Sequence, residues 1–343
     1  MFERALMLRS APSWPPVRGG TVLEALQRKV RLPKWGAPLT MIFAIGVASS
    51  AHCESRAELE VIELRPNIHL IAGAGDNIVV QTGEDGVVVV GAGDGKSTEA
   101  VLNAIRKLSD KPIRYILDTS GHPDEVGGNQ KLAAAGKQFG QATTGGLFNE
   151  GAMIVAHENV MLRMANGPSE AWPAETFFSR IKTMFLNGEG IEIRSRPAAY
   201  SNGDTTVFFR RSDVIVAGQL IDATRFPTID IEHGGSVQGL LQALNDLIWE
   251  AIPQVPLAWR DGGTLVVPAR GRVYERDDIV QYRDMVTIVR DRVKGMIDRG
   301  MTKPQVLAAN PAKGYLTWFG TDKTWTAAMF VDAIYTSLSD KKP

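Results

Sequence analysis

The chain has 343 residues, 44% of them hydrophobic, and equal numbers of acidic and basic side chains, 38 of each. That length suits one large globular domain, or at most two, of the kind found in soluble enzymes. Zero formal net charge gives no electrostatic reason to expect nucleic acid or an anionic membrane surface as a partner. The single cysteine, Cys53, excludes a disulfide framework.

The N-terminal region has the layout of a secretory signal peptide that follows an extension. Basic residues precede an apolar run, Ala37 to Val47, and small residues continue to Ala51. The run is too short for a membrane-spanning helix, which needs roughly 20 residues. We therefore expect residues 1–51 to be an extension and signal peptide, and residues 57–343 to form an exported, periplasmic domain without a transmembrane segment.

The first half of the domain predicts a β-meander followed by a strand, a helix and another strand. Three short apolar stretches, Ile68–Ile71, Asn77–Val80 and Val87–Val90, are separated by tight polar turns. Apolar residues recur at helical spacing over Ser97–Leu108, and Arg114–Leu117 then returns as a buried strand. Because α/β folds expose functional side chains beyond the carboxyl ends of strands, the loop after this last strand is the first place to look for a site.

The second half predicts a hairpin, a further strand and three helices. In chain order these are strands Val207–Phe209 and Val214–Ala217, helix Val237–Trp249, strand Leu265–Val267, and helices Ile279–Arg299 and Thr324–Leu338. Ser236 is the expected N-cap of the first helix, because its hydroxyl can accept a free backbone N–H of the first turn. The last helix is expected to bury an apolar stripe made by Trp325, Met329, Phe330 and Ile334.

The loop after the strand Arg114–Leu117 carries the most informative motif. Residues 119–129 read Thr-Ser-Gly-His-Pro-Asp-Glu-Val-Gly-Gly-Asn. Their frame resembles Thr-His-x-His-x-Asp-His-x-Gly-Gly-Asn of the metallo-β-lactamase superfamily, in which histidines and a carboxylate hold a pair of zinc ions. Other landmarks extend this resemblance over about residues 60–340: Asp85–Val90, Lys111–Tyr115, Ala156–Val160, Gly203–Thr205 and Gly234–Ser236. The resemblance implies a four-layer αβ/βα sandwich with two mixed β-sheets and outer helices.

The resemblance also shows which zinc ligands of the loop have been replaced. The first histidine of the family motif falls on Ser120, the second on His122, the carboxylate on Asp124 and the third histidine on Glu125. Zinc needs three or four nitrogen, sulfur or carboxylate ligands. Of the family's ligands in the loop, His122 and Asp124 remain. Glu125 is a candidate for a third ligand, through a carboxylate oxygen.

Three further ligand positions of the family fall on Tyr200, Gln219 and Arg270. A neutral phenol is a poor zinc ligand, and a neutral amide in place of the bridging carboxylate removes the link between two metals. A guanidinium about 4.5 Å from a divalent cation, at an effective dielectric of about 20, is repelled by roughly 7 kcal/mol. We therefore expect Arg270 to occupy the vacated space and to pair with Asp124, Glu125 or both.

The predicted ligand-binding pocket has seven members: Ser120, His122, Asp124, Glu125, Tyr200, Gln219 and Arg270. The preferred interpretation is a pseudoenzyme that has lost dinuclear zinc hydrolysis, needs no cofactor and binds a small polar or anionic ligand. The alternative is an enzyme of the same superfamily. It would be a divergent hydrolase with one zinc ion at His122, Asp124 and Glu125, or a metal-free catalyst with Tyr200 and Glu125 as acid and base. Stoichiometric bound zinc would favour the alternative.

His157 lies in one of the landmarks but is not among the family's usual metal ligands. A hydrogen bond at a helix start is its simplest role, and a functional role in the pocket is the other reading.

Overall fold

The computed structural model describes residues 59–139, 151–254 and 262–339. The chain divides into two units, Met1–Glu54 and Ser55–Pro343, and all the described helices and strands belong to the second. The predicted extension and signal peptide, residues 1–51, lie outside the described residues. Within the described ranges, no helix combines the length and apolar character that crossing a membrane requires.

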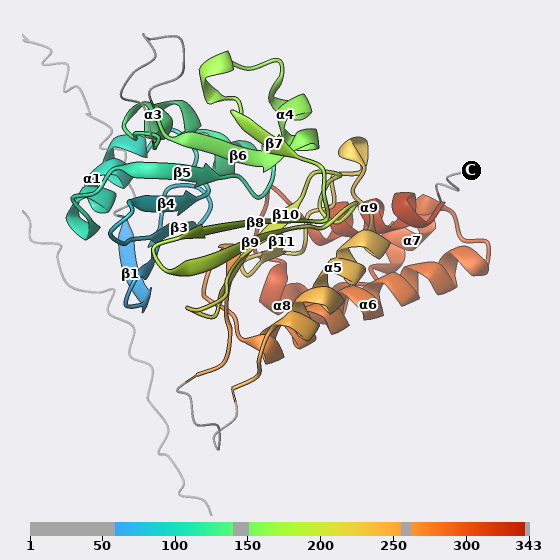
Figure 1. The fold of residues 1–343 in the computed structure, drawn as a ribbon. Coiled ribbons are helices and arrows are strands. Elements are labelled where there is room, and N and C mark those ends of the chain that lie inside the picture. Colours follow the sequence, from blue (N-terminus) through green and yellow to red (C-terminus); the bar gives the residue numbers. More distant parts are fainter. Residues whose placement is uncertain (1–58, 140–150, 255–261, 340–343) are drawn as a thin grey trace, which may run out of the picture. The chain divides into compact units, whose positions relative to one another are not determined.

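The first β-sheet runs in sequence order and is mixed (Figure 1). Its strands within the described residues are β1 (Glu60–Arg65), β2 (Ile68–Ala72), β3 (Ile78–Gln81), β4 (Val87–Val90), β5 (Ile113–Leu117), β6 (Met153–His157) and β7 (Glu175–Phe177). Neighbours are antiparallel from β1 to β4 and parallel from β4 to β7. The predicted β-meander and the parallel strand after it are therefore confirmed, whereas β6 and β7 were not predicted.

The second sheet is also mixed, in the order β12-β11-β10-β9-β8. Its strands are β8 (Ile181–Leu186), β9 (Glu189–Ser195), β10 (Thr205–Phe209), β11 (Val214–Asp222) and β12 (Leu265–Arg270). Among the described strands of this sheet, only the β11–β12 pair is parallel. The predicted hairpin of β10 and β11 is confirmed. β11 continues to Asp222, well past the predicted end at Ala217, and is buried throughout.

The hairpin of β8 and β9 was missed. Its two-residue turn is Asn187-Gly188, and both residues adopt positive φ, 56° and 68°. An Asn-Gly pair between two strands is the usual sequence of this tight turn, because both central positions need the left-handed region. That dipeptide is the signal from which the hairpin could have been predicted.

The helices within the described residues are α1 (Thr98–Leu108), α2 (Pro123–Val126), α3 (Asn129–Ala134), α4 (Glu158–Met164), α5 (Val237–Glu250), α6 (Arg276–Asp298), α7 (Lys303–Ala309), α8 (Leu316–Phe319) and α9 (Ala327–Ser339). The four predicted helices correspond to α1, α5, α6 and α9, and Ser236 caps α5 by accepting the Gly239 N–H at 2.9 Å. One detail of α9 was wrong. Met329 is 43% exposed, while Phe330 and Ile334 are fully buried, so the buried stripe is narrower than predicted.

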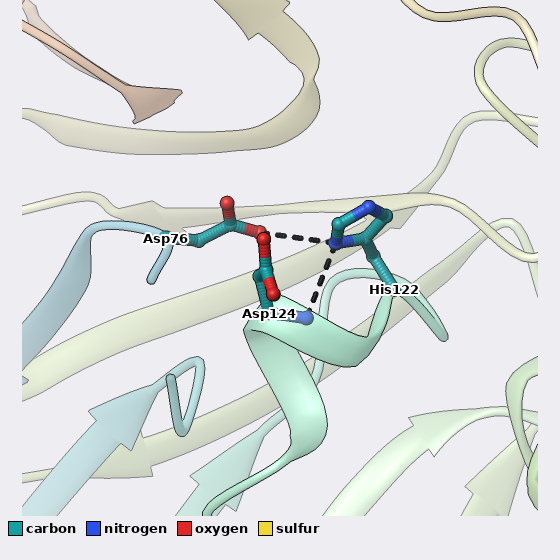
Figure 2. A group of neighbouring side chains, drawn as sticks. All are labelled: Asp76, His122 and Asp124. Carbon is teal, nitrogen blue, oxygen red and sulfur yellow. Dashed lines mark hydrogen bonds and ion pairs between the residues drawn. The ribbon is translucent and has the colours of Figure 1, made fainter. Parts of the chain in front are cut away.

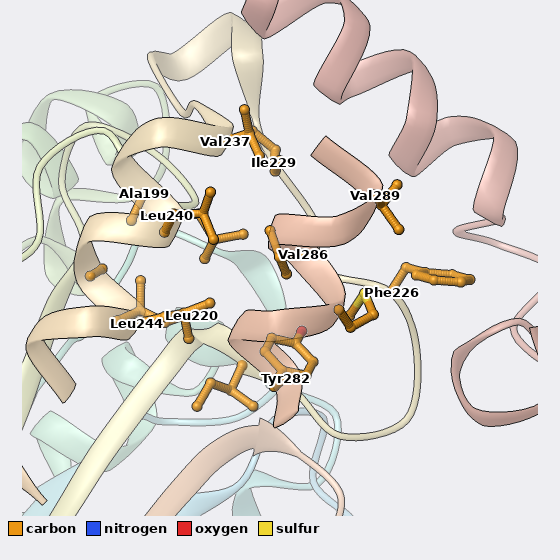
Figure 3. Packing of buried hydrophobic residues seen from close by; sticks show 14 of the residues in the cluster. Ala199, Leu220, Phe226, Ile229, Val237, Leu240, Leu244, Tyr282, Val286 and Val289 are labelled. Carbon is orange, nitrogen blue, oxygen red and sulfur yellow. The ribbon is translucent and has the colours of Figure 1, made fainter. Parts of the chain in front are cut away.

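Three apolar cores separate four layers. One core lies between α1, α3 and the first sheet, a second lies between the two sheets, and the third lies between the second sheet and α5, α6 and α9. Figure 3 shows part of the third core, in which Leu240 and Leu244 of α5 face Tyr282 and Val286 of α6. The predicted four-layer sandwich with two mixed sheets is confirmed.

Candidate functional site

Three side chains of the kinds that bind metals meet at one edge of the sandwich. Asp76, His122 and Asp124 offer ligand atoms that all lie within 4.8 Å of one another (Figure 2). Asp76 comes from the turn between β2 and β3, whereas His122 and Asp124 come from the start of α2, directly after β5. His122 and Asp124 were predicted members of the site, whereas Asp76, in the turn before the strand Asn77–Val80, was not predicted to belong to it.

His122 is the N-cap of α2. Its ring Nδ1 accepts the backbone N–H of Asp124 at 3.2 Å and lies 3.7 Å from Oδ2 of Asp76, and both contacts converge on this nitrogen in Figure 2. Because Nδ1 acts as an acceptor, the neutral ring carries its proton on Nε2. His122 therefore presents an N–H donor on the side of the ring opposite its cap.

The imidazole of His122 stays neutral at physiological pH. Burial is the largest reason that its pKa falls to about 4. Asp124 acts in the opposite direction, and the positive charges of Arg270, Arg225 and Arg163 lower the pKa further.

Arg270, at the end of β12, joins the two carboxylates of this cluster. Its Nε donates to Oδ1 of Asp76 at 2.9 Å, and its Nη2 donates to Oδ2 of Asp124. The expected pair between Arg270 and Asp124 is confirmed. The second partner is Asp76 and not Glu125, so the guanidinium lies between the carboxylates of Asp76 and Asp124. The side chains of His122, Asp124 and Arg270 are partly exposed, 24% for Arg270, and form the solvent-facing side of the cluster, called its mouth below.

Asp76 is the most constrained member of the cluster. The amide Nε2 of Gln219, on β11, donates to its Oδ2. Burial raises the pKa of Asp76 to about 7, although the charge of Arg270 opposes that rise. Gln219 stands where the resemblance places a metal-bridging carboxylate, and its amide now binds a carboxylate supplied by a different element.

Glu125 lies beneath the loop and takes no part in the cluster. One oxygen accepts from the backbone N–H of Thr119, from its hydroxyl at 2.6 Å and from the Ser120 N–H at 3.2 Å, and the other accepts from the Ser120 hydroxyl at 2.6 Å. Burial raises its pKa, and these hydrogen bonds oppose the rise. With 4% of its surface exposed, Glu125 anchors the loop from inside. The third candidate metal ligand beside His122 and Asp124 is therefore Asp76, and not Glu125 as predicted.

Tyr200 lies between β9 and β10, and its ring borders the cluster beside His122. Its ring meets His122 edge-on, with 6.0 Å between centroids and 68° between planes. The guanidinium carbon of Arg163 lies 5.7 Å from its centroid. Burial raises the pKa of Tyr200 to about 12, so the phenol stays protonated at neutral pH. Its hydroxyl can donate or accept a hydrogen bond but is a poor source of negative charge for a metal.

A small cavity lies beside Asp76 and Glu125. Its volume is about 10 Å³, and Thr119 and Gly218 are among the residues that line it. That volume is close to the minimum that holds one water molecule. A polyatomic ligand must therefore lie further out, where the side chains of His122, Asp124 and Arg270 are 20%, 40% and 24% exposed.

The three candidate ligands do not fit zinc while Arg270 holds its place. One imidazole and two carboxylates are suitable donors by type. However, Arg270 already binds both carboxylates and brings a fixed positive charge into the space that the ion would need. The histidine positions of the resemblance other than His122 carry Ser120, Glu125, Tyr200 and Arg270, and none of these side chains offers zinc a nitrogen ligand.

Two landmarks of the resemblance serve local structure. His157 is the N-cap of α4, where its Nδ1 accepts the Asn159 N–H at 3.2 Å, so its expected role at a helix start is confirmed. Asp204 is buried and accepts the N–H and hydroxyl of Ser201 at 2.6 and 2.7 Å. These bonds fix the turn that follows Tyr200.

The sequence matches no family model and no curated protein, but the structure resembles several solved structures. A metallo-β-lactamase from Pontibacter korlensis is 17% identical, with a TM-score of 0.52 over 67% of this chain and 99% of that one. The DIM-1 metallo-β-lactamase is 13% identical, with a TM-score of 0.51 over 67% and 97%. The sec-alkylsulfatase Pisa1 from Pseudomonas sp. is 12% identical, with a TM-score of 0.60. The match covers 83% of this chain and 51% of that longer protein. The chain therefore has the metallo-β-lactamase fold.

Proposed function

We propose that this protein is an exported binding protein of the metallo-β-lactamase fold, in which the Arg270 guanidinium supplies the positive charge that metal ions supply elsewhere. Its ligand is a small anion or a molecule with an anionic group, bound at the mouth of the site. The observation that carries the proposal is the position of Arg270 between Asp76 and Asp124.

Two hydrogen-bond donors remain for a ligand at this mouth. Among the described residues, neither Nη1 of Arg270 nor Nε2 of His122 donates to a protein acceptor. A carboxylate, sulfate or phosphate group is a suitable acceptor for either donor, and the bond from the guanidinium is charge-assisted and therefore among the stronger kinds. Because Arg270 is already held by two carboxylates, it is oriented before the ligand arrives.

The same geometry argues against hydrolysis. Activation of water needs a metal ion or a general base within hydrogen-bond reach. His122 is neutral, but its acceptor nitrogen already binds the Asp124 N–H. Glu125 is enclosed by four donors, and Asp124 is paired with Arg270. No carboxylate of the predicted pocket is thus left unpaired to act as a base.

A second candidate function is a mononuclear metallohydrolase. One observation favours it, namely the approach of Asp76, His122 and Asp124 to within 4.8 Å of one another. It requires Arg270 to leave both carboxylates so that the ion can enter. Repulsion between the guanidinium and a divalent cation, roughly 7 kcal/mol at about 4.5 Å and a dielectric of about 20, weighs against this candidate.

The proposal is tested by calorimetric titration with sulfate, phosphate and succinate at constant ionic strength set with chloride. Wild type should bind at least one of these anions, and Arg270→Met should weaken that binding at least tenfold. The matched control is Arg272→Met, since Arg272 is an exposed arginine paired with Asp278 outside the cluster, and it should bind as wild type does. Absence of binding to wild type, or equal binding to Arg270→Met, would show that the proposal is wrong.

Export is a separate part of the proposal and rests on the sequence of residues 1–51. N-terminal sequencing of the protein recovered from the periplasm should give a start near residue 52. A full-length chain that stays in the cytoplasm would contradict export without affecting the binding proposal.

A further inference from the structure

The strand β8 forms an edge of the second sheet and exposes apolar side chains. Ile181 is 51% exposed and Phe185 is 75% exposed, and Phe178, just before the strand, is 81% exposed. Exposure alternates along β8, so Ile181, Thr183 and Phe185 share the outer face, while Leu186 at the end of the strand is buried. An exposed edge strand with large apolar residues is unusual, because it invites pairing with another strand.

The backbone of the same three residues faces the free edge. In a hairpin with a two-residue turn, the residues that flank the turn exchange hydrogen bonds, and the bonded pairs then alternate along the ladder. Leu186 and Glu189 are that first pair here. The Ser195 N–H donates to the Arg180 carbonyl, which continues the same alternation. The even-numbered residues of β8 therefore bond to β9, and the N–H and C=O groups of Ile181, Thr183 and Phe185 point outward. The Ile181 carbonyl accepts the Ser179 hydroxyl at 3.0 Å and keeps a second lone pair for a donor from another strand.

We propose that this edge is a homodimer interface, in which β8 pairs antiparallel with β8 of a second copy about a twofold axis through Thr183. This register places Thr183 opposite its own counterpart. It places Ile181 of each copy opposite Phe185 of the other, on the outer face. The two five-stranded sheets become one continuous sheet across the axis.

The chemistry of β8 fits a second copy because the strand is complementary to itself. Cross-strand pairs of an aromatic with a β-branched side chain are favourable, and the register forms this pair twice by symmetry. Lys182, the one charged residue of β8, is already paired with Glu175 of its own chain, so it does not repel its counterpart. A small residue, Thr183, lies on the axis, where its side chain faces its own counterpart without crowding.

The apolar surface available is sizeable for such a contact. Phe178 and Phe185 are 81% and 75% exposed, and a phenylalanine has roughly 150–250 Å² to bury. The exposed area of the two rings is about 300 Å² per copy, against the ~800 Å² per partner in a standard interface, and the register places the Phe185 ring at the contact. The paired backbone and Ile181 add to this area.

The register is tested by disulfide cross-linking in a Cys53→Ser background. Thr183→Cys places the two cysteines directly opposite each other, at a Cα separation of about 5.5 Å, which a disulfide can span. Ile181→Cys is the matched control on the same face, because its counterpart lies about 14 Å away along the strand. Thr183→Cys should cross-link efficiently on mild oxidation, and Ile181→Cys should not.

Sedimentation of the unmodified chain and of two variants gives an independent test. Thr183→Pro removes an N–H that faces the free edge and does not bond to β9, so it should weaken dimerisation at least tenfold while the far-ultraviolet spectrum is kept. Trp318→Lys, which changes an aromatic residue on α8 that is 67% exposed, should leave the dimer unchanged. A wild-type chain that stays monomeric at every concentration, or equal cross-linking of the two cysteine variants, would overturn the proposal.

Discussion

Replacing Arg270 with methionine tests the charge replacement at the centre of the site. Arg270→Met keeps most of the side-chain volume but leaves Asp76 and Asp124 without their shared cation. The two carboxylates should respond differently. The Asp124 side chain is 40% exposed, so the loss of its pair should cost about 1 kcal/mol or less. The Asp76 side chain is only 5% exposed, so water cannot replace the guanidinium there.

The free energy of unfolding that is lost at Asp76 in Arg270→Met should depend on pH. In wild type, the pKa of Asp76 is raised from its ordinary 3.8 to about 7, so the folded chain binds more protons than the unfolded chain between these values. The contribution of Asp76 to stability therefore falls as pH rises to about 7 and is constant above it. Without Arg270 the pKa of Asp76 rises further, and stability should continue to fall above pH 7, by about 1.4 kcal/mol per pH unit.

Urea unfolding followed by tryptophan fluorescence at pH 6 and pH 9 measures this effect. We expect Arg270→Met to lower the free energy of unfolding by about 1 kcal/mol or less at pH 6 and by about 2–4 kcal/mol at pH 9. Arg272→Met, which breaks a pair whose arginine side chain is 65% exposed, should cost little at both pH values. An equal loss for Arg270→Met at pH 6 and pH 9 would show that Arg270 does not stabilise the charged form of Asp76.

Two other predictions concern the loop beneath the site. Glu125→Gln turns an amide N–H₂ toward the donors of Thr119 and Ser120, so it should lower the free energy of unfolding by about 1–3 kcal/mol in a urea titration. The control is Glu84→Gln, at an almost fully exposed side chain, which should change the free energy of unfolding by less than about 0.5 kcal/mol. Gly218→Ala places a Cβ 2.1 Å from the Thr119 hydroxyl at a φ of +53°. Thermal unfolding should therefore show that the free energy of unfolding falls by more than about 2 kcal/mol. Gly314→Ala, with open space around it, is the control, and an equal fall for both variants would show that crowding at Thr119 is not the cause.

Local sequence patterns predicted much of the fold. The helix α1 and the strands β3 and β4 follow from apolar periodicity, and α5 follows from its Ser236 cap, because these signals lie within each segment. β8 was missed since it is an edge strand with exposed apolar residues, which do not give the usual inside–outside pattern.

The candidate site was predictable only in part. The pair between Arg270 and Asp124 followed from complementary changes, the loss of metal ligands and the appearance of a cation. Asp76 could not be found in this way, because its partners Gln219 and Arg270 lie 143 and 194 positions away in the sequence. The orientation of Glu125 was also hidden, since it depends on donors that gather beneath the loop only when β5 and α2 are in place.

The replacement of metal charge by the Arg270 guanidinium is tested by the zinc content per chain, measured on the purified protein after dialysis against trace zinc. We predict no stoichiometric zinc in wild type, because Arg270 holds Asp76 and Asp124. Arg270→His should gain zinc, because the change removes the opposing charge and adds an imidazole beside Asp76, His122 and Asp124. Near one zinc ion per wild-type chain would show that the guanidinium does not replace the metal and would favour a mononuclear hydrolase.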